Sequence, residues 1–139
     1  MNVKQYLNQV RLLDKKINQR IEEKEYLMGK ATSTGSSGNM DPDKVQGSLN
    51  LHKNEELITK YIDLEHEINS MIDQFVDLKH KIIGQIQQLE DVHQVDCLMQ
   101  RYVDYNSFEL IAVNMGYSIR RIYQIHGDAL QAFKNKHCI

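Results

Sequence analysis

The sequence predicts an all-α fold, with a long antiparallel, coiled-coil-like helical hairpin followed by a C-terminal three-helix domain of the helix-turn-helix type. Apolar residues recur at helical spacing over residues 3–28 and again over 51–89. No segment shows the period-two alternation of a strand, and a glycine separates two short helical patterns near the C-terminus. We therefore expect a helical and dimerising region over 1–90, with a flexible linker at 30–50, and a helix-turn-helix domain over 91–139.

Residues 3–28 have the pattern of an amphipathic helix. With Val3 at heptad position a, positions a, d and e are mostly apolar. The apolar members are Val3, Tyr6, Leu7, Val10, Leu13, Ile17, Ile21, Leu27 and Met28, and the polar exceptions are Asp14, Arg20 and Lys24. Gly29 follows as the expected end of this helix. Residues 30–50 are rich in Ser, Thr and Gly, with too few apolar residues to offset the entropy of ordering, so we expect a flexible, poorly ordered linker.

Residues 51–89 show the clearest pattern in the chain. With Leu51 at position a, most residues at a, d, e and g are apolar, with polar exceptions such as Asn54, Glu65 and Lys79, whereas every b, c and f position is polar or glycine. A two-stranded coiled coil needs only a narrow a/d seam, so one partner cannot cover this stripe. We expect the helix, roughly 58 Å long at about 1.5 Å per residue, to pack on the first helix and on a second copy, as a homodimer. The alternative is a monomer in which the C-terminal domain closes the stripe.

Histidines recur every fourteen residues in this helix, always at heptad position b: His52, His66 and His80. Fourteen residues of helix separate neighbours by about 21 Å, which is too far for one metal ion to bridge. We interpret them as solvated surface residues. The acidic residues of the same helix (Glu55, Glu56, Asp63, Glu67, Asp73 and Asp77) lie on its polar face and form no expected catalytic cluster.

A further helix is predicted over 92–103, with Asp91 as its N-cap. The residues expected to form its buried face are Val92, Val95, Leu98, Met99 and Tyr102. Residues 104–107 form a predicted turn, and Asn106 or Ser107 is expected to cap the next helix.

The segment 108–126 carries the helix-turn-helix pattern. Counting Phe108 as position one, the three most restrictive positions, five, nine and fifteen, hold Ala112, Gly116 and Ile122. Position five must be small because two helices cross there, position nine needs glycine for a positive φ, and position fifteen is an apolar wedge between the helices. The rest of the expected apolar face is Leu110, Ile111, Met115 and Ile125.

The second helix of this pair has the residues of a DNA-reading surface. Ser118 is its expected N-cap, which leaves first-turn amides and the positive end of the helix dipole available to a phosphate. Ile122, Ile125 and Leu130 are expected to face inward, and Ile119, Arg120, Arg121, Tyr123 and Gln124 to project outward. In the major groove, arginine reads guanine and glutamine reads adenine. We therefore predict binding to double-stranded DNA, with Tyr123 on a base or a phosphate. Alternatively, Arg120 and Arg121 contact only phosphates or pair with nearby acidic residues.

The composition sets further bounds. Of the 139 residues, 41% are hydrophobic and 26% are charged, as in ordinary globular proteins. No run approaches the roughly eighteen apolar residues of a membrane span, and the N-terminus lacks the layout of a signal peptide. Cys97 and Cys138 lie far apart without metal-ligand spacing, which favours free thiols in a reducing compartment. We expect a cytoplasmic protein with no membrane association.

Charge is unevenly distributed along the chain. The net charge of −2 does not by itself indicate a nucleic-acid-binding protein. Residues 51–90 hold four basic and eight acidic side chains, whereas 105–139 hold four basic and two acidic ones. Four basic residues neutralise only a few phosphates per copy, so a monomer should bind DNA weakly.

No catalytic, cofactor or metal site is predicted. The sequence contains no nucleophile with a neighbouring base, no Gly-rich phosphate loop and no cluster of metal ligands, so we predict that it is not an enzyme. Cys138 lies beside His137, but at an end of the chain expected to fray. His126 and Gly127 are expected where helices approach closely, and no chemistry is assigned to them.

The C-terminal segment resembles the fourth region of sigma factors. The matching runs are Gln100–Val103, Ser107–Ala112, Met115–Ser118, Arg121–Tyr123 and His126–Leu130. More closely, nearly the whole chain resembles a family of small proteins from phages and prophages of Gram-positive bacteria, with Lys30–Ser33 (Lys-Ala-Thr-Ser) in the linker and Val76–Lys79 (Val-Asp-Leu-Lys) in the long helix. That family is similar to late-gene transcription activators of the RinA and ArpU type. Val92 stands where relatives often have proline.

The resemblance implies a C-terminal domain that reads a promoter element near −35 and helps to recruit the host RNA polymerase. The chain has no tryptophan and three phenylalanines, and lacks the aromatic cluster needed to capture a melted −10 strand, so an activator or accessory role is favoured over a stand-alone sigma factor. The alternative is a protein-interaction scaffold that binds through its helical bundle and does not bind DNA. The operator, the polymerase surface and the sign of regulation stay open.

Overall fold

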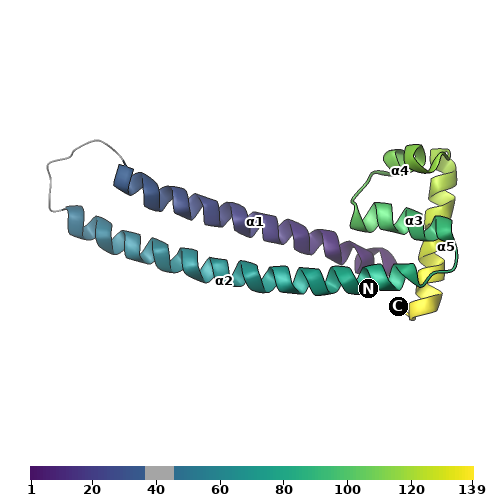
Figure 1. Ribbon diagram of the computed structural model, residues 1–139, viewed down its shortest axis with the longest axis horizontal. Helices are drawn as coiled ribbons and strands as arrows, with labels where there is room; N and C mark the ends of the chain where they lie inside the picture. Colours follow the sequence, from purple (N-terminus) through teal and green to yellow (C-terminus); the bar gives the residue numbers. More distant parts are fainter. Residues whose placement is uncertain (37–45) are drawn as a thin grey trace. The chain divides into compact units, whose positions relative to one another are not determined.

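The computed structural model describes residues 1–36 and 46–139, with side chains described for 1–30 and 54–139. All regular structure in these ranges is helical, and they contain no strand, which confirms the all-α prediction. The elements are α1 (Val3–Ser36), α2 (Gln46–Gln87), α3 (Val92–Leu98), a π-helical segment η1 (Met99–Val103), α4 (Phe108–Met115) and α5 (Ile119–His137) (Figure 1).

The two long helices extend beyond their predicted ends. Gly29 was expected to stop the first helix, but α1 continues through it to Ser36, and α2 begins at Gln46. An interior glycine costs a helix about 1 kcal/mol and does not by itself end it. Both ends of the predicted 30–50 linker are therefore helical, and its central part, 37–45, lies outside the described residues.

The contacts divide the chain into two compact units, one of residues 1–14 with 74–139 and the other of residues 15–73. Each unit has its own buried side chains. The predicted boundary between two domains at residue 90 stays a prediction.

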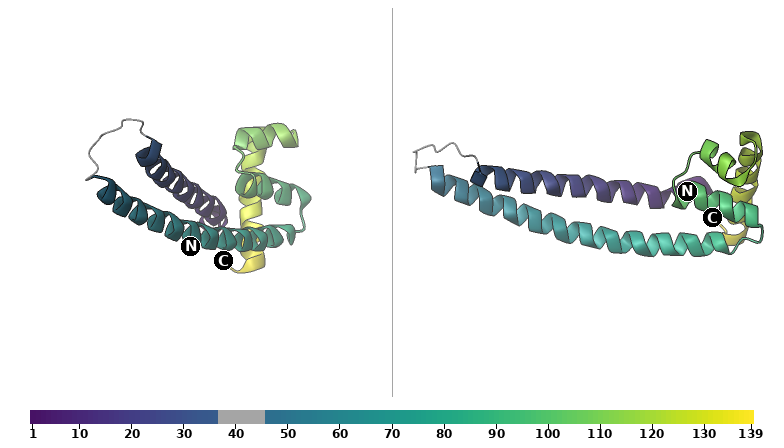
Figure 2. Two further views of the ribbon diagram at one scale, coloured as in Figure 1. Left: turned by 60° about the vertical axis from the view of Figure 1, so that its left-hand side comes forward. Right: turned by 45° about the horizontal axis from the view of Figure 1, so that its top comes forward.

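In the unit formed by residues 15–73, a segment of α1 packs against a segment of α2 (Figure 2). Ile17, Leu64 and Ile68 are buried there. Arg20 pairs with Glu67 at 3.2 Å and Lys24 with Glu65 at 3.7 Å, so the two segments run antiparallel. Exposed ion pairs of this kind contribute at most about 1 kcal/mol each, and the buried apolar residues provide the main packing.

Only one side of the broad apolar stripe of α2 is covered in this unit. Residues at heptad positions d and g (Leu57, Tyr61, Leu64, Ile68 and Met71) are buried or half-buried. The described apolar residues at the a and e positions remain exposed, with exposed fractions of 51% for Ile58, 44% for Ile62 and 38% for Ile72. The prediction that one partner helix leaves part of the stripe uncovered is confirmed for these residues.

The unit of residues 1–14 and 74–139 joins the start of α1 and the end of α2 to the C-terminal helices. Its main core is Val3, Leu7, Val10, Ile82, Ile86, Leu89, Leu98, Tyr102, Val103, Ala129 and Phe133. The Tyr6 hydroxyl donates to Oε1 of Gln85 at 2.6 Å, and its ring lies 6.0 Å from that of Phe133. His137 Nε2 lies 2.9 Å from the backbone oxygen of Gln85. α5 is thus held against both long helices within this unit.

The helix predicted over 92–103 forms as α3 followed by η1. As predicted, Asp91 caps it, because its carboxylate accepts hydrogen bonds from the backbone N–H groups of His93 and Gln94. Val92 was expected to be buried but is 76% exposed. Periodicity indicates which face of a helix is apolar, but not how much of its length a neighbour covers.

Candidate nucleic-acid interface

Two serines begin the helices at the predicted interface. The Ser107 side chain accepts from the backbone N–H of Leu110 at 3.2 Å and caps α4. Ser118 accepts from the backbone N–H of Arg121 at 3.2 Å and caps α5. Ser118 is the predicted cap of α5, and Ser107 is the one of the two predicted candidates, Asn106 and Ser107, that caps α4. Each satisfies a donor that a helix N-terminus otherwise leaves unpaired.

Gly116 ends α4 in the left-handed conformation, with φ of 73° and ψ of 29°. The N–H of Tyr117 bonds to the carbonyl of Ala112 at 3.0 Å, and that of Gly116 to the carbonyl of Val113 at 3.3 Å, which is the Schellman arrangement. No atom lies within 4 Å of the place where a Cβ of Gly116 would stand. The glycine is therefore needed for its backbone conformation, as predicted, and not for space.

A small core joins α4 and α5. It consists of Cys97, Ile111, Ala112, Ile122 and Ile125, with Phe108 and Met115 packed against it. The predicted burial of Ala112, Ile122 and Ile125 is confirmed. Leu110, expected on the same apolar face, is 44% exposed, so that expectation was wrong. Leu130 is half-buried.

Cys97 reaches this core from α3, a contact that the sequence did not predict. Its side chain is fully buried, and the thiol is free. Burial, and secondarily the charge of Asp96, raises the pKa of Cys97 to about 11, against a smaller opposing effect of Arg101. The residue therefore stays a neutral packing group at physiological pH.

The residues predicted to contact DNA all lie on the exposed side of α5 and its cap: Ser118, Ile119, Arg120, Arg121, Tyr123 and Gln124. Nη1 of Arg121 donates to Oε1 of Gln124 at 3.3 Å, so these two side chains share one surface. Within the described ranges, Arg120 and Arg121 form no ion pair with an acidic side chain, and the first turn of α5 holds no acidic residue. The start of α5 is thus a locally basic surface.

Tyr123 lies against Phe108, and Phe108 in turn lies against Arg101; neither residue belongs to the predicted set. Its ring lies 5.1 Å from that of Phe108 in an edge-to-face arrangement. The guanidinium carbon of Arg101 lies 4.2 Å from the Phe108 ring centroid, and its Nη1 donates to the backbone oxygen of Asn106 at 3.1 Å. A cation–π contact of this kind contributes about 0.5–2 kcal/mol. No spacing in the sequence signals this arrangement, because η1, α4 and α5 supply one member each.

His126 is a second residue whose role the sequence did not reveal. It is 6% exposed, its Nε2 lies 2.7 Å from the Tyr102 hydroxyl, and its ring meets that of Phe108 edge to face at 4.9 Å. Burial, followed by the positive charges of Lys4 and Arg101, lowers the pKa of His126 to about 4. The imidazole is therefore neutral at physiological pH. Gly127 makes no close helix approach, contrary to expectation, because no atom lies within 4 Å of its Cβ position.

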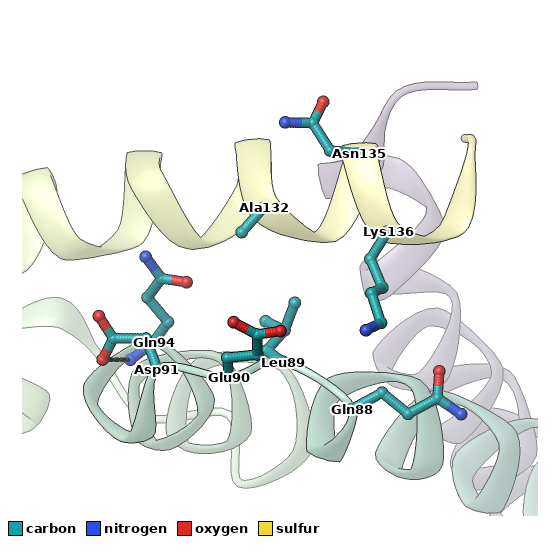
Figure 3. A pocket seen from close by; sticks show the side chains of 8 residues that line it. All are labelled: Gln88, Leu89, Glu90, Asp91, Gln94, Ala132, Asn135 and Lys136. Atoms are coloured by element: carbon teal, nitrogen blue, oxygen red, sulfur yellow. Dashed lines mark hydrogen bonds between the residues drawn. The ribbon is translucent and has the colours of Figure 1, made fainter.

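A groove of about 460 Å³ lies beside the last turns of α5. It is lined by Gln88, Leu89, Glu90, Asp91, Gln94, Ala132, Asn135 and Lys136. Figure 3 shows Ala132 and Lys136 projecting from α5 toward the segment that joins α2 to α3, whereas Asn135 points away from it. The groove holds none of the residues predicted to contact DNA.

Two further observations concern only the described residues. No three His, Cys, Asp or Glu side chains gather as metal ligands there; His66 and His80 are exposed, and the side chain of His52 falls outside the described set. Within the same ranges, no helix is long and apolar enough to cross a membrane.

Comparison of the chain with models of protein families, with curated proteins and with solved structures finds no match to any of them. The function is therefore inferred from the residues of this chain and from their geometry.

Proposed function

We propose that the protein is a phage-type transcription regulator, which binds promoter DNA through a helix-turn-helix formed by α4 and α5. The observation that carries the proposal is the turn at Gly116. It joins two capped helices by a left-handed glycine, with Ala112 and Ile122 buried between them and an arginine-bearing surface facing outward. In this class of motif, the second helix enters the major groove with its N-terminal residues on the bases.

The chemistry of the α5 surface fits that role. Ser118 leaves the positive end of the helix dipole at the surface, where a DNA phosphate is favoured. Arg120, Arg121 and Gln124 are exposed and offer the donors and the acceptor used to read base edges. Tyr123, oriented by Phe108, is placed on the same helix to contact a phosphate or a base.

Recruitment of the host RNA polymerase belongs to the same proposal. It is supported by the resemblance of residues 100–130 to the fourth region of sigma factors, in which α3, α4 and α5 would form the three-helix domain. The chain lacks the aromatic cluster that a promoter-melting factor requires. The protein is therefore proposed to assist a polymerase that has its own melting machinery.

We also propose a homodimer. The C-terminal residues 105–139 carry four basic side chains, and each phosphate contact contributes roughly one unit to the salt dependence of binding. Two copies on paired half-sites would double the contacts. The exposed apolar side chains Ile58, Ile62 and Ile72 provide a surface on which two copies can associate.

The test is selection of bound sequences from random double-stranded DNA by the full chain, followed by affinity measurements at several salt concentrations. A regulator should enrich one sequence, and its logarithmic affinity should fall linearly with the logarithm of salt concentration. Added RNA polymerase should tighten binding to the enriched site. If the dimer binds no DNA even at low salt, the proposal fails.

A scaffold that binds only proteins is the second candidate. The exposed apolar residues on α2 favour it, because such surfaces mark protein interaction sites. It predicts self-association or partner binding without any enriched DNA sequence in the same selection.

A further inference from the structure

The exposed apolar residues described in α2 occupy one regular series of heptad positions. Heptad positions a and e from residue 55 onward hold, in order, Glu55, Ile58, Ile62, Glu65, Asn69, Ile72, Val76 and Lys79, and we call this series the a/e ridge. Its apolar members, Ile58, Ile62, Ile72 and Val76, are the exposed large apolar residues of the described part of α2, with Val76 56% exposed. Its apolar members are exposed, whereas Glu65 and Lys79 are half-buried, with Glu65 beside Lys24 of α1 and Lys79 over the ring of Phe75.

The order of residue types along the ridge is self-complementary. The two middle positions, Glu65 and Asn69, are polar. Two apolar residues flank them on either side, and the ends carry opposite charges, Glu55 at one and Lys79 at the other. Read backwards, the ridge presents a cation, two apolar residues, the polar pair, two apolar residues and an anion.

We propose that two copies of the chain pair through this ridge in antiparallel orientation, about a two-fold axis at the level of residue 67. Ile62 then meets the second copy's Ile72, because 62 and 72 lie equally far from 67. By the same rule, Ile58 meets Val76 and Glu55 meets Lys79. In a two-fold interface, each such pair occurs twice, as an isologous surface requires.

The middle of the ridge fits the same register. Glu65 meets the second copy's Asn69, whose amide N–H groups can donate to the carboxylate. The Glu65 carboxylate also lies 3.7 Å from Nζ of Lys24 in its own copy. It therefore keeps a cation and gains a donor, and the charge at the centre of the interface is not left unpaired.

Other registers of the same ridge are mismatched. An antiparallel pair shifted by one heptad sets Ile62 against Glu65 in one direction and against Lys79 in the other. A parallel pair in register sets Glu65 against Glu65 and Lys79 against Lys79, and like charges disfavour such pairing. Only the arrangement centred on residue 67 places apolar residues on apolar ones and the anion on the cation.

This inference refines the homodimer of the proposed function, and it is tested without DNA. The first experiment measures the dimer dissociation constant by sedimentation equilibrium for the full chain, for Glu55→Lys, for Lys79→Glu and for the doubly exchanged variant. Each single change creates two like-charged pairs per dimer, and we expect it to weaken the dimer about tenfold. The double variant should return to the affinity of the unchanged chain.

The second experiment determines whether the two copies pair in antiparallel or parallel orientation. In a Cys138→Ser background, copies carrying Ile62→Cys are mixed with copies carrying Ile72→Cys and are oxidised. Cys97 stays in place, because it is buried and its high pKa keeps the thiol unreactive. An antiparallel pair crosslinks the mixture and leaves each single variant uncrosslinked.

Crosslinking of Ile62→Cys with itself shows a parallel pair and overturns the proposal. A chain that is monomeric at all concentrations, or a double charge exchange that does not restore affinity, overturns it as well. Failure of the DNA selection leaves these results untouched, so the antiparallel dimer and the DNA-binding function stand or fall separately.

Discussion

The hydroxyl of Tyr102 lies 2.7 Å from Nε2 of His126, and both side chains are buried. Burial raises the pKa of Tyr102 to about 12 and lowers that of His126 to about 4, so both groups are neutral near pH 7. In the tautomer that carries its proton on Nδ1, Nε2 of the imidazole accepts a hydrogen bond from the tyrosine hydroxyl. This bond joins η1 to α5, and thereby positions the helix that is proposed to read DNA.

Tyr102→Phe should destabilise the protein. The change removes a hydroxyl and leaves a buried imidazole nitrogen without its partner, which costs about 1–3 kcal/mol. Urea unfolding followed by circular dichroism measures the loss. Tyr26→Phe is the control, because Tyr26 is 62% exposed and should lose almost nothing. Equal stability of the two variants would show that the Tyr102–His126 bond does not contribute.

The free energy of unfolding should decrease as the pH is lowered from about 6.5 to about 4. The unfolded chain binds a proton at His126 near pH 6.5, whereas the folded chain binds it only near pH 4. Between these values the unfolded state holds more protons, so lowering the pH favours unfolding, by a total of about 3 kcal/mol at about 1.4 kcal/mol per pH unit. The full loss of stability is present below about pH 4, and no loss is present above about pH 7.

The measurement is the free energy of unfolding from pH 7.5 to 4, for the unchanged chain and for His126→Gln. The glutamine variant should lose the part of the slope that belongs to His126, while the other five histidines are present in both proteins. If both proteins show the same slope, His126 is not the group responsible.

Gly116→Ala should destabilise the junction of α4 and α5 by about 1–2 kcal/mol, because φ of 73° is strained for a residue with a Cβ. Gly127→Ala is a matched control, since Gly127 lies inside α5 with φ outside the left-handed region and open space at its Cβ position. That change should stabilise by about 0.5–1 kcal/mol. Thermal melting of both variants gives the comparison, and the same sign for both would contradict the assigned turn.

Ala112→Leu should disrupt the packing of α4 on α5. Ala112 is 8% exposed in the core with Ile111, Ile122 and Ile125, and three added carbons overpack it by about 1–3 kcal/mol. Val113→Leu on the next residue is the control, because Val113 is 77% exposed. An unchanged melting curve for Ala112→Leu would remove this residue from the helix crossing.

Arg120→Ala and Gln124→Ala should each weaken binding to the selected DNA sequence by about 1–3 kcal/mol, without loss of helicity. Gln131→Ala serves as the control on the same helix, since Gln131 is exposed and bonds to Asn135 one turn further along. Affinities are measured by fluorescence anisotropy at fixed salt. Unchanged affinity in both variants would exclude Arg120 and Gln124 from base reading.

Much of the candidate interface could be predicted because it is local. The caps at Asp91, Ser107 and Ser118 need only a side-chain oxygen within three residues of a free N–H group. The left-handed turn at Gly116 is a property of one residue's backbone. Apolar periodicity predicted the helices themselves and the burial of Ile122, since both depend on side chains a few positions apart.

Other features depended on which helices meet. Val92 and Leu110 fit the apolar pattern of their helices, yet they are exposed, because no described neighbour covers them. The predicted stop at Gly29 failed because one glycine is too small a cost to end a long helix.

By itself, the sequence determined the helical class, the positions of the caps and the inward and outward faces of α5, because each is set by interactions within about one helical turn. The tertiary structure decided that Phe108, beneath Arg101, lies against Tyr123, that His126 is buried against Tyr102, and that α1 covers the d and g side of α2 over residues 57–71. These contacts join residues from separate helices, so their geometry exists only after the helices have packed.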